Sequence, residues 1–151
     1  MKDKTIDYVL RATWQAVTKM YNEQAAKFES TMATGFALLS IDPEGGTPST
    51  ALGPKMGMEA TSLSRTLKTM EDRGLIIRKP NPDDGRSVLI HLTEYGQEKR
   101  SYSKDRVIKF NDTVRSQLPE EKINHFYEVM ETINDLIQNK KIYNQLETLN
   151  K

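Results

Sequence analysis

The stretch EATSLSRTLKTMEDRGLIIRKPNPDDGRSVLIHLT, residues 59–93, decides the fold that we predict. Its first half has apolar residues at the spacing of an amphipathic helix, and Gly74 can end that helix because glycine readily adopts left-handed backbone angles. Two β-rich runs, residues 74–79 and 86–93, flank a turn of Asn, Pro, Asp and Gly, which favour tight turns. A helix followed by a two-stranded hairpin is therefore predicted. By itself the turn chemistry favours a solvated loop tip over an Arg86 held out to contact a partner.

The sequence on both sides of this stretch predicts further helices. Helical patterns cover four segments, residues 5–28, 30–42, 94–118 and 119 onward. Ser30 or Thr31 can cap the second of them, and residues 50–57 predict a weaker, short helix. A lone hairpin is marginal in water unless it packs on something, and the helix pair before it is the obvious support. The predicted fold is mainly α with a small β-hairpin wing, a winged helix-turn-helix. Three apolar residues near the C-terminus either extend the last helix or dock it: Ile142, Leu146 and Leu149.

Length and composition narrow the class of protein. The 151 residues suit one domain or one compact two-part subunit. The net charge of +1 predicts no polyanion partner, so any nucleic-acid contact must come from local charge. The absence of cysteine excludes disulfides, thiolate zinc sites and cysteine nucleophiles. No apolar run has the length of a signal-peptide core or a membrane span, so we expect a cytoplasmic protein that does not enter a membrane.

The helix predicted over residues 59–74 has an outer face suited to DNA. Leu63, Leu67 and Met70 form its inward stripe. The outer side carries short hydroxyls and two cations: Thr61, Ser62, Ser64, Arg65 and Lys68. Arginine and lysine can pair with guanine in the major groove, and Ser or Thr can donate or accept. An ordinary solvated face explains the same pattern equally well. The seven cations and five anions of residues 55–86 give a local charge of +2, which slightly favours DNA.

Other classes of site have little support in the sequence. We find no glycine-rich phosphate loop, nucleophile elbow or metal-ligand cluster, so we expect no enzyme activity, no cofactor and no metal. His91 and His125 are far apart and lack ligand-like spacing. Trp14 and Phe36 either line a ligand pocket or belong to the core, and core is the usual place for aromatic residues at helical spacing.

Residues 52–96 resemble the MarR (multiple antibiotic resistance regulator) family of bacterial transcription factors. The helix-turn-helix pattern of that family falls on Leu52, Met56, Gly57, Met58, Thr61, Leu63, Ser64, Arg65, Met70, Glu71, Arg73, Gly74 and Leu75. Its wing signature falls on Asp84, Arg86, Leu92, Thr93 and Gly96. Gly53 and Pro54 depart from the pattern, because helix formers usually stand there, so the first helix of the pair is expected to start near Pro54.

The resemblance implies a homodimeric, ligand-responsive repressor that binds a pseudo-palindromic operator. Residues 30–93 would form the DNA-binding lobe, and residues 1–29 and 94–151 the helical dimerisation lobe. Arg86 would enter the minor groove, where a narrow groove attracts arginine, and Asp84 would accept from its guanidinium. The effector class implied is a small lipophilic or aromatic anion. The alternative is a winged-helix module for protein contacts or scaffolding, without DNA binding.

Overall fold

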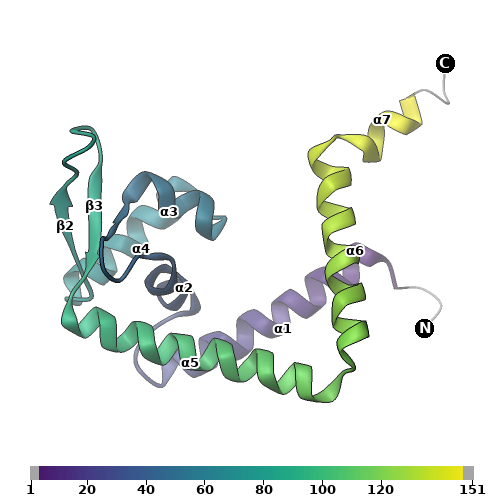
Figure 1. Cartoon of the computed structure of the whole chain (residues 1–151), viewed down its shortest axis with the longest axis horizontal. Helices are drawn as coiled ribbons and strands as arrows, with labels where there is room; N and C mark the ends of the chain where they lie inside the picture. The colour runs from purple at the N-terminus through teal and green to yellow at the C-terminus, as the bar shows by residue number, and fades with distance from the viewer. Residues whose placement is uncertain (1–3, 148–151) are drawn as a thin grey trace. The chain divides into compact units, whose positions relative to one another are not determined.

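A computed structural model describes residues 4–147 of the chain, without the side chains of residues 145–147. Its elements, in order, are α1 (Ile6–Ala26), α2 (Met32–Ser40), β1 (Thr47–Pro48), α3 (Ser49–Met56), α4 (Ala60–Asp72), β2 (Ile76–Pro80), β3 (Val88–Leu92), α5 (Glu94–Gln117), α6 (Glu120–Gln138) and α7 (Lys141–Glu147) (Figure 1). The chain divides into two compact units, one ending at Arg106 and one beginning at Val107. The lobe boundaries implied by the family resemblance stay a prediction. None of the helices in the described part is both long and apolar enough to cross a membrane.

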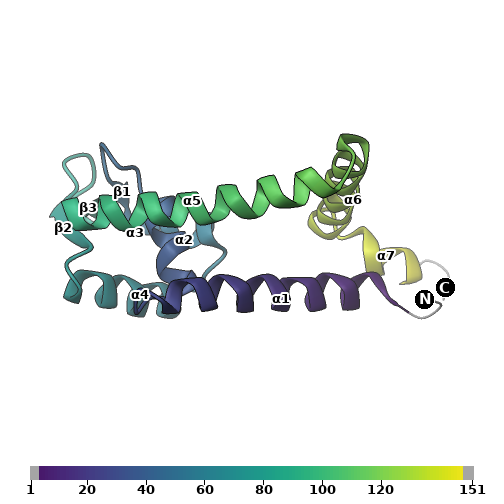
Figure 2. The same ribbon diagram turned by 90° about the horizontal axis from the view of Figure 1, so that it is seen from below.

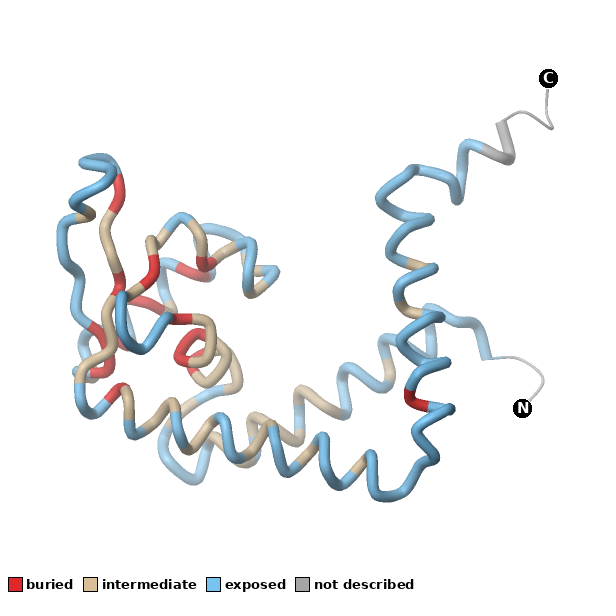
Figure 3. Tube along the Cα trace, in the orientation of Figure 1, coloured by how far each residue is buried: buried red, intermediate tan, exposed pale blue. Residues whose placement is uncertain are grey.

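The core of the first unit lies between α2, α3, α4 and the sheet. Figure 3 shows the buried residues gathered there. Its members come from every one of these elements: Ala37, Leu38, Ile41, Leu52, Leu63, Leu67, Met70, Leu75, Ile76 and Ile90. The inward stripe predicted for the helix of residues 59–74 is confirmed, because Leu63, Leu67 and Met70 are all buried. Burial of these side chains fixes which face of α4 remains outside.

The wing has three strands rather than the two that were predicted. The sheet order is β1-β3-β2 and both pairings are antiparallel, with Ile76 opposite Leu92 and Thr47 opposite Ile90. The additional strand, β1, has two residues and one of them is proline, so no alternating pattern announces it. The Thr47 hydroxyl accepts the Asp42 amide at 2.8 Å, which holds β1 against the preceding turn.

Capping residues explain the start of α2 and the end of α4, and the start of α3 differs from the prediction. Thr31 caps α2 by accepting the Thr34 amide, and Gly74 takes the predicted left-handed conformation after α4 (φ 73°). The first helix of the pair was expected to start near Pro54, and this is wrong: α3 starts at Ser49 and contains Pro54. The proline removes only one helical hydrogen bond, and burial of Leu52 holds the short helix in place.

The second unit contains α6 and α7, which contact each other. A sharp turn separates the two helices, because Lys140 has left-handed backbone angles (φ 52°). Ile142 therefore belongs to a separate helix and does not extend α6. The side chain of Leu146 and the whole of Leu149, which formed the same prediction, lie outside the described residues. Several apolar side chains of α6 are exposed, among them Phe126, Val129 and Ile137.

Candidate nucleic-acid interface

The outer face of α4 presents the five predicted polar residues together. Glu59, in an extended conformation, is the N-cap, and its carbonyl accepts the Leu63 amide at 3.0 Å. With the apolar stripe buried, Thr61, Ser62, Ser64, Arg65 and Lys68 are all exposed. The structure thus places these side chains where a double helix could reach them.

The two cations of this face differ in their surroundings. Lys68 forms an ion pair with Asp72 at 3.6 Å, and both side chains are largely exposed. An exposed i,i+4 pair is weak, so Lys68 remains available to a stronger partner. Among the described residues, no hydrogen bond or ion pair engages the Arg65 guanidinium. The carbonyl of Arg65 accepts the Thr69 hydroxyl at 3.0 Å, so its backbone is bound while its charged group is free.

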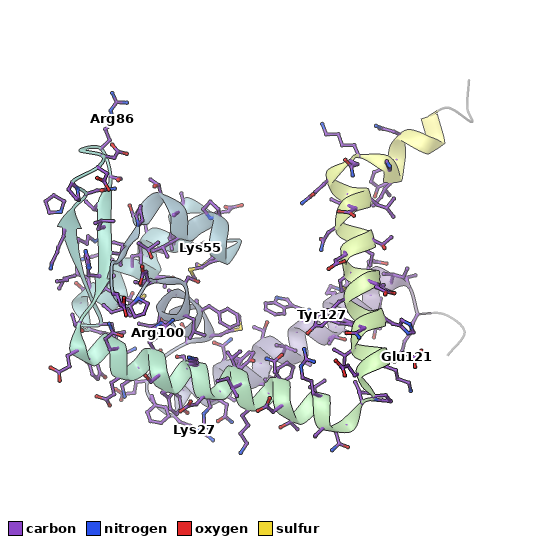
Figure 4. All side chains as sticks on the ribbon, in the orientation of Figure 1. Lys27, Lys55, Arg86, Arg100, Glu121 and Tyr127 are labelled. Atoms are coloured by element: carbon purple, nitrogen blue, oxygen red, sulfur yellow. The ribbon has the colours of Figure 1, made fainter. Side chains whose placement is uncertain are left out.

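Arg86 lies at the tip of the wing and projects away from it (Figure 4). The Asp84 carboxylate accepts the backbone amide of Arg86 at 3.0 Å, and the Asp84 carbonyl accepts the Ser87 amide at 3.2 Å. The sequence had suggested that Asp84 accepts from the guanidinium, and the structure differs. No ion pair joins the two side chains in the part of the chain that the structure describes. Asp84 shapes the loop backbone and leaves the arginine charge uncompensated.

A second brace at the base of the wing loop was missed from the sequence. The Asn81 side-chain amide donates to the Ser87 hydroxyl at 2.9 Å, and its oxygen accepts the Asp83 amide at 3.0 Å. Ser87 is buried (9% exposed), which limits competition from water. An Asn two residues before an Asp in a turn is the available signal, because Asn commonly accepts the amide two residues on. The loop that carries Arg86 is therefore closed on both sides.

The wing and α4 are also joined directly. The Arg78 guanidinium of β2 donates to the Glu71 carboxylate of α4 at 3.1 Å. The Leu75 amide donates to the Met70 carbonyl at 2.9 Å, so a backbone hydrogen bond closes the turn between α4 and β2. Both candidate contact surfaces thus belong to one packed unit.

The other residues singled out in the sequence do not belong to the outer face of α4 or to the tip of the wing. Trp14 is 54% exposed, so of its two predicted places it does not occupy the core of the single chain. The Phe36 ring meets the Tyr21 ring edge to face at 5.7 Å, and burial raises the pKa of Tyr21 above 10.0. His91 lies against Gly46 in the wing, while His125 is exposed. Within residues 4–147 we find no group of three or more potential metal ligands.

Residues 31–88, from the cap of α2 to the first residue of β3, match the model of the MarR family. Over these residues the chain is similar to the MarR family. A curated relative is the organic hydroperoxide resistance transcriptional regulator of Bacillus subtilis, which is 35% identical over 89 residues. The match covers 59% of this chain and 60% of the relative. The chain thus spans about three fifths of the length of that regulator. Similarity to a transcriptional regulator agrees with the prediction that the chain is not an enzyme.

Solved structures share the MarR fold. The complex of Staphylococcus aureus MepR with DNA has a TM-score of 0.79 at 19% identity, over 88% of this chain and 98% of that one. The PcaV regulator of Streptomyces coelicolor, solved with its natural ligand, has a TM-score of 0.74 at 20% identity, over 89% and 98%. At these identities the likeness concerns the fold. It confirms a mainly helical MarR-like chain with a small three-stranded wing.

Proposed function

We propose that this chain is a sequence-specific DNA-binding transcription regulator that acts in the cytoplasm as a homodimeric repressor on a pseudo-palindromic operator. The observation that carries the proposal is the exposed face of α4. Its hydroxyls and the unpaired Arg65 lie opposite a fully packed apolar stripe, and the wing that holds Arg86 belongs to the same unit. A recognition helix with a wing beside it is an established way to read both grooves.

Each candidate residue has a role in this proposal. Arg65 pairs with guanine in the major groove. Lys68 leaves its ion pair with Asp72 and binds a base or a phosphate. The hydroxyls of Thr61, Ser62 and Ser64 supply adaptable donors and acceptors along the same edge. Arg86 enters the adjacent minor groove, and Asp84 holds the loop that presents it.

Exposed apolar side chains support a homodimer. On α1 they include Ile6 (66% exposed) and Trp14, and on α6 they include Phe126 and Ile137. Several large apolar side chains exposed on one helix favour an interaction site, because leaving them in water is unfavourable. In the proposal, residues 1–29 and 94–151 bury these side chains against a second copy, and residues 30–93 bind DNA. Two-fold symmetry then requires half-sites roughly one helical turn, about 34 Å, apart.

A small lipophilic or aromatic anion is the effector class that we propose. The supporting observation is that related folds were solved with small molecules, among them PcaV with its natural ligand. Such a ligand acts by binding one arrangement of the subunits better than the arrangement that fits DNA.

Fluorescence anisotropy with the duplex upstream of the chain's own gene tests the proposal, across a salt series and beside an unrelated duplex. We expect tight binding to the upstream duplex that weakens steeply with salt, because lysine and arginine displace counterions from phosphate. Sedimentation of the same sample should give a dimer. Absence of binding at low salt would contradict the proposal and favour a winged-helix module for protein contacts.

A further inference from the structure

Arg73, the residue that follows α4, joins the end of that helix to the end of α1. Its Nη1 donates to the carbonyl of Glu29 at 2.6 Å, and its Nη2 donates to the carbonyl of Phe28 at 3.3 Å. Figure 2 shows α4 next to the C-terminal end of α1. Phe28 and Glu29 follow the cap of α1, so their carbonyls have no amide partner within the helix and are open to a side-chain donor.

The charge of Arg73 suits this place. The C-terminal end of a helix carries partial negative charge, which a nearby cation stabilises. Arg73 is itself the C-cap of α4, and its guanidinium reaches the two residues that follow the cap of α1. The backbone of Arg73 thus caps α4 while its guanidinium lies at the end of α1. The planar fork of arginine donates to two carbonyls at once, a geometry that a lysine ammonium does not reproduce.

The two hydrogen bonds from Arg73 to the carbonyls of Phe28 and Glu29 form a clasp. The acceptor residues of this clasp are held by a third helix, α5. The Phe28 ring packs on the Tyr102 ring of α5, with 4.2 Å between centroids, and the Lys99 ammonium lies 5.1 Å from the Phe28 ring. Glu29 takes left-handed backbone angles (φ 55°), and the Ser30 amide donates back to the Ala25 carbonyl at 3.0 Å. The end of α1 cannot shift without moving either Arg73 or α5.

The chain just beyond Arg73 is held as well. The Thr93 hydroxyl donates to the Gly74 carbonyl at 2.5 Å, and the Thr93 amide donates to the Leu75 carbonyl at 3.0 Å. The C-terminal end of α4 is therefore anchored to α1 and to the start of α5. The opposite end of α4 carries the proposed DNA contacts.

We propose that Arg73 is a positioning residue of the DNA-binding site. Its clasp sets the angle of α4 against α1 and α5, and through it displacements of those helices alter DNA binding. Arg73 contacts no DNA in this account. The inference rests on the proposed function, because it assigns a control point to that same recognition helix.

The test compares Arg73→Gln, which breaks the clasp, with Arg73→Lys, which keeps the charge. Lys27→Gln is the matched control, because it removes a cation from the same end of α1 without touching the clasp (Figure 4). Affinity for the upstream duplex is measured at several salt concentrations, and amide exchange of residues 28–34 is measured in the free protein. Circular dichroism verifies that each variant is folded. If Arg73→Gln does not fold, the DNA affinity of Arg73→Lys is compared with that of the unmodified chain instead.

We expect Arg73→Gln to bind about tenfold more weakly, Arg73→Lys to show a smaller loss, and Lys27→Gln to resemble the unmodified chain. Exchange of residues 28–34 should be faster in Arg73→Gln. The slope of log affinity against log salt should stay unchanged, whereas loss of a phosphate contact lowers it by about 0.9.

Three results would overturn the inference. Unchanged affinity in Arg73→Gln would show that the clasp does not position α4. A slope lowered by about one phosphate contact would show that Arg73 touches DNA. Absence of DNA binding by the unmodified chain would overturn the proposed function, and the positioning role with it. Because the unmodified chain binds DNA in the first two results and does not in the third, the two failures are distinguishable.

Discussion

Gly96 of α5 lies against the backbone of Leu75 so closely that a Cβ atom on Gly96 would overlap the Leu75 carbonyl oxygen. The same carbonyl accepts the Thr93 amide, and the Thr93 hydroxyl accepts the Gly96 amide at 3.0 Å. These contacts explain why threonine and glycine stand three residues apart after the wing. They dock the first turn of α5 on the segment that links α4 to β2.

Gly96→Ala should destabilise the fold, because the atom it would overlap belongs to backbone and cannot rotate away. We expect a loss of about 3 kcal/mol in the free energy of unfolding, the upper part of the range for overpacking. Urea unfolding followed by circular dichroism measures it. Gly85→Ala is the control, because nothing lies near its Cβ position and it has no left-handed backbone. Equal stability of the two variants would refute the packing described for Gly96.

Arg65→Ala should reduce sequence specificity more than general DNA affinity. The guanidinium is exposed and unpaired in the described chain, so its removal leaves the fold intact. Loss of one bidentate contact to guanine costs about 1–3 kcal/mol of discrimination. The measurement is the ratio of affinities for the upstream duplex and for variants with one base pair changed. A ratio that stays the same at every position would exclude Arg65 as a base contact.

Arg86→Ala should weaken binding most when the duplex flanking the half-sites is rich in A and T. Narrow minor grooves in such flanks concentrate negative potential, which attracts arginine. Because Asp84 binds the backbone amide of residue 86 and not its guanidinium, the wing loop should keep its shape in the variant. Paired titrations with A/T-rich and G/C-rich flanks provide the measurement. Equal losses for both flanks would argue against minor-groove binding by the wing.

Asp42 should contribute to acid sensitivity. The backbone N–H groups of Glu44 and Gly45 hold the pKa of its carboxyl below 3.8, with a smaller effect of Lys55. A lowered pKa in the folded state means that the stabilisation is present above the unfolded value near 3.8 and is lost as pH falls through the folded value. Asp42→Asn should therefore be less stable than the unmodified chain at pH 6, and the gap should close as pH falls through the lowered folded-state pKa of Asp42. Urea midpoints over this range measure the gap, and a gap that is independent of pH would contradict the assignment.

The sequence predicted the elements whose pattern is local. Leu63, Leu67 and Met70 recur at helical spacing, and Gly74 follows at the stop, so α4 was predictable within a residue or two. The hairpin was equally visible, because two β-rich runs flank a turn. The predicted contact residues of α4 share one exposed face for the same reason.

Features that depend on distant or atypical residues could not be predicted. Strand β1 has only two residues, too few to show an alternating apolar and polar pattern. It forms because Thr47 pairs with Ile90, which is far along the chain. The turn before α7 rests on a left-handed Lys140, where sequence rules look for glycine. The Arg73 clasp joins residues 44 positions apart, so no local spacing in the sequence predicts it.

Site-directed cleavage of DNA from the wing tip tests the central claim most directly. The chain contains no cysteine, so Gly85→Cys can carry a single iron chelate next to Arg86 without competing labels. On the upstream duplex, the account predicts two clusters of minor-groove cuts on opposite strands, one at the outer flank of each half-site. An unrelated duplex should show no clusters. Uniform cutting along a bound upstream duplex, or binding without any cuts, would contradict the account.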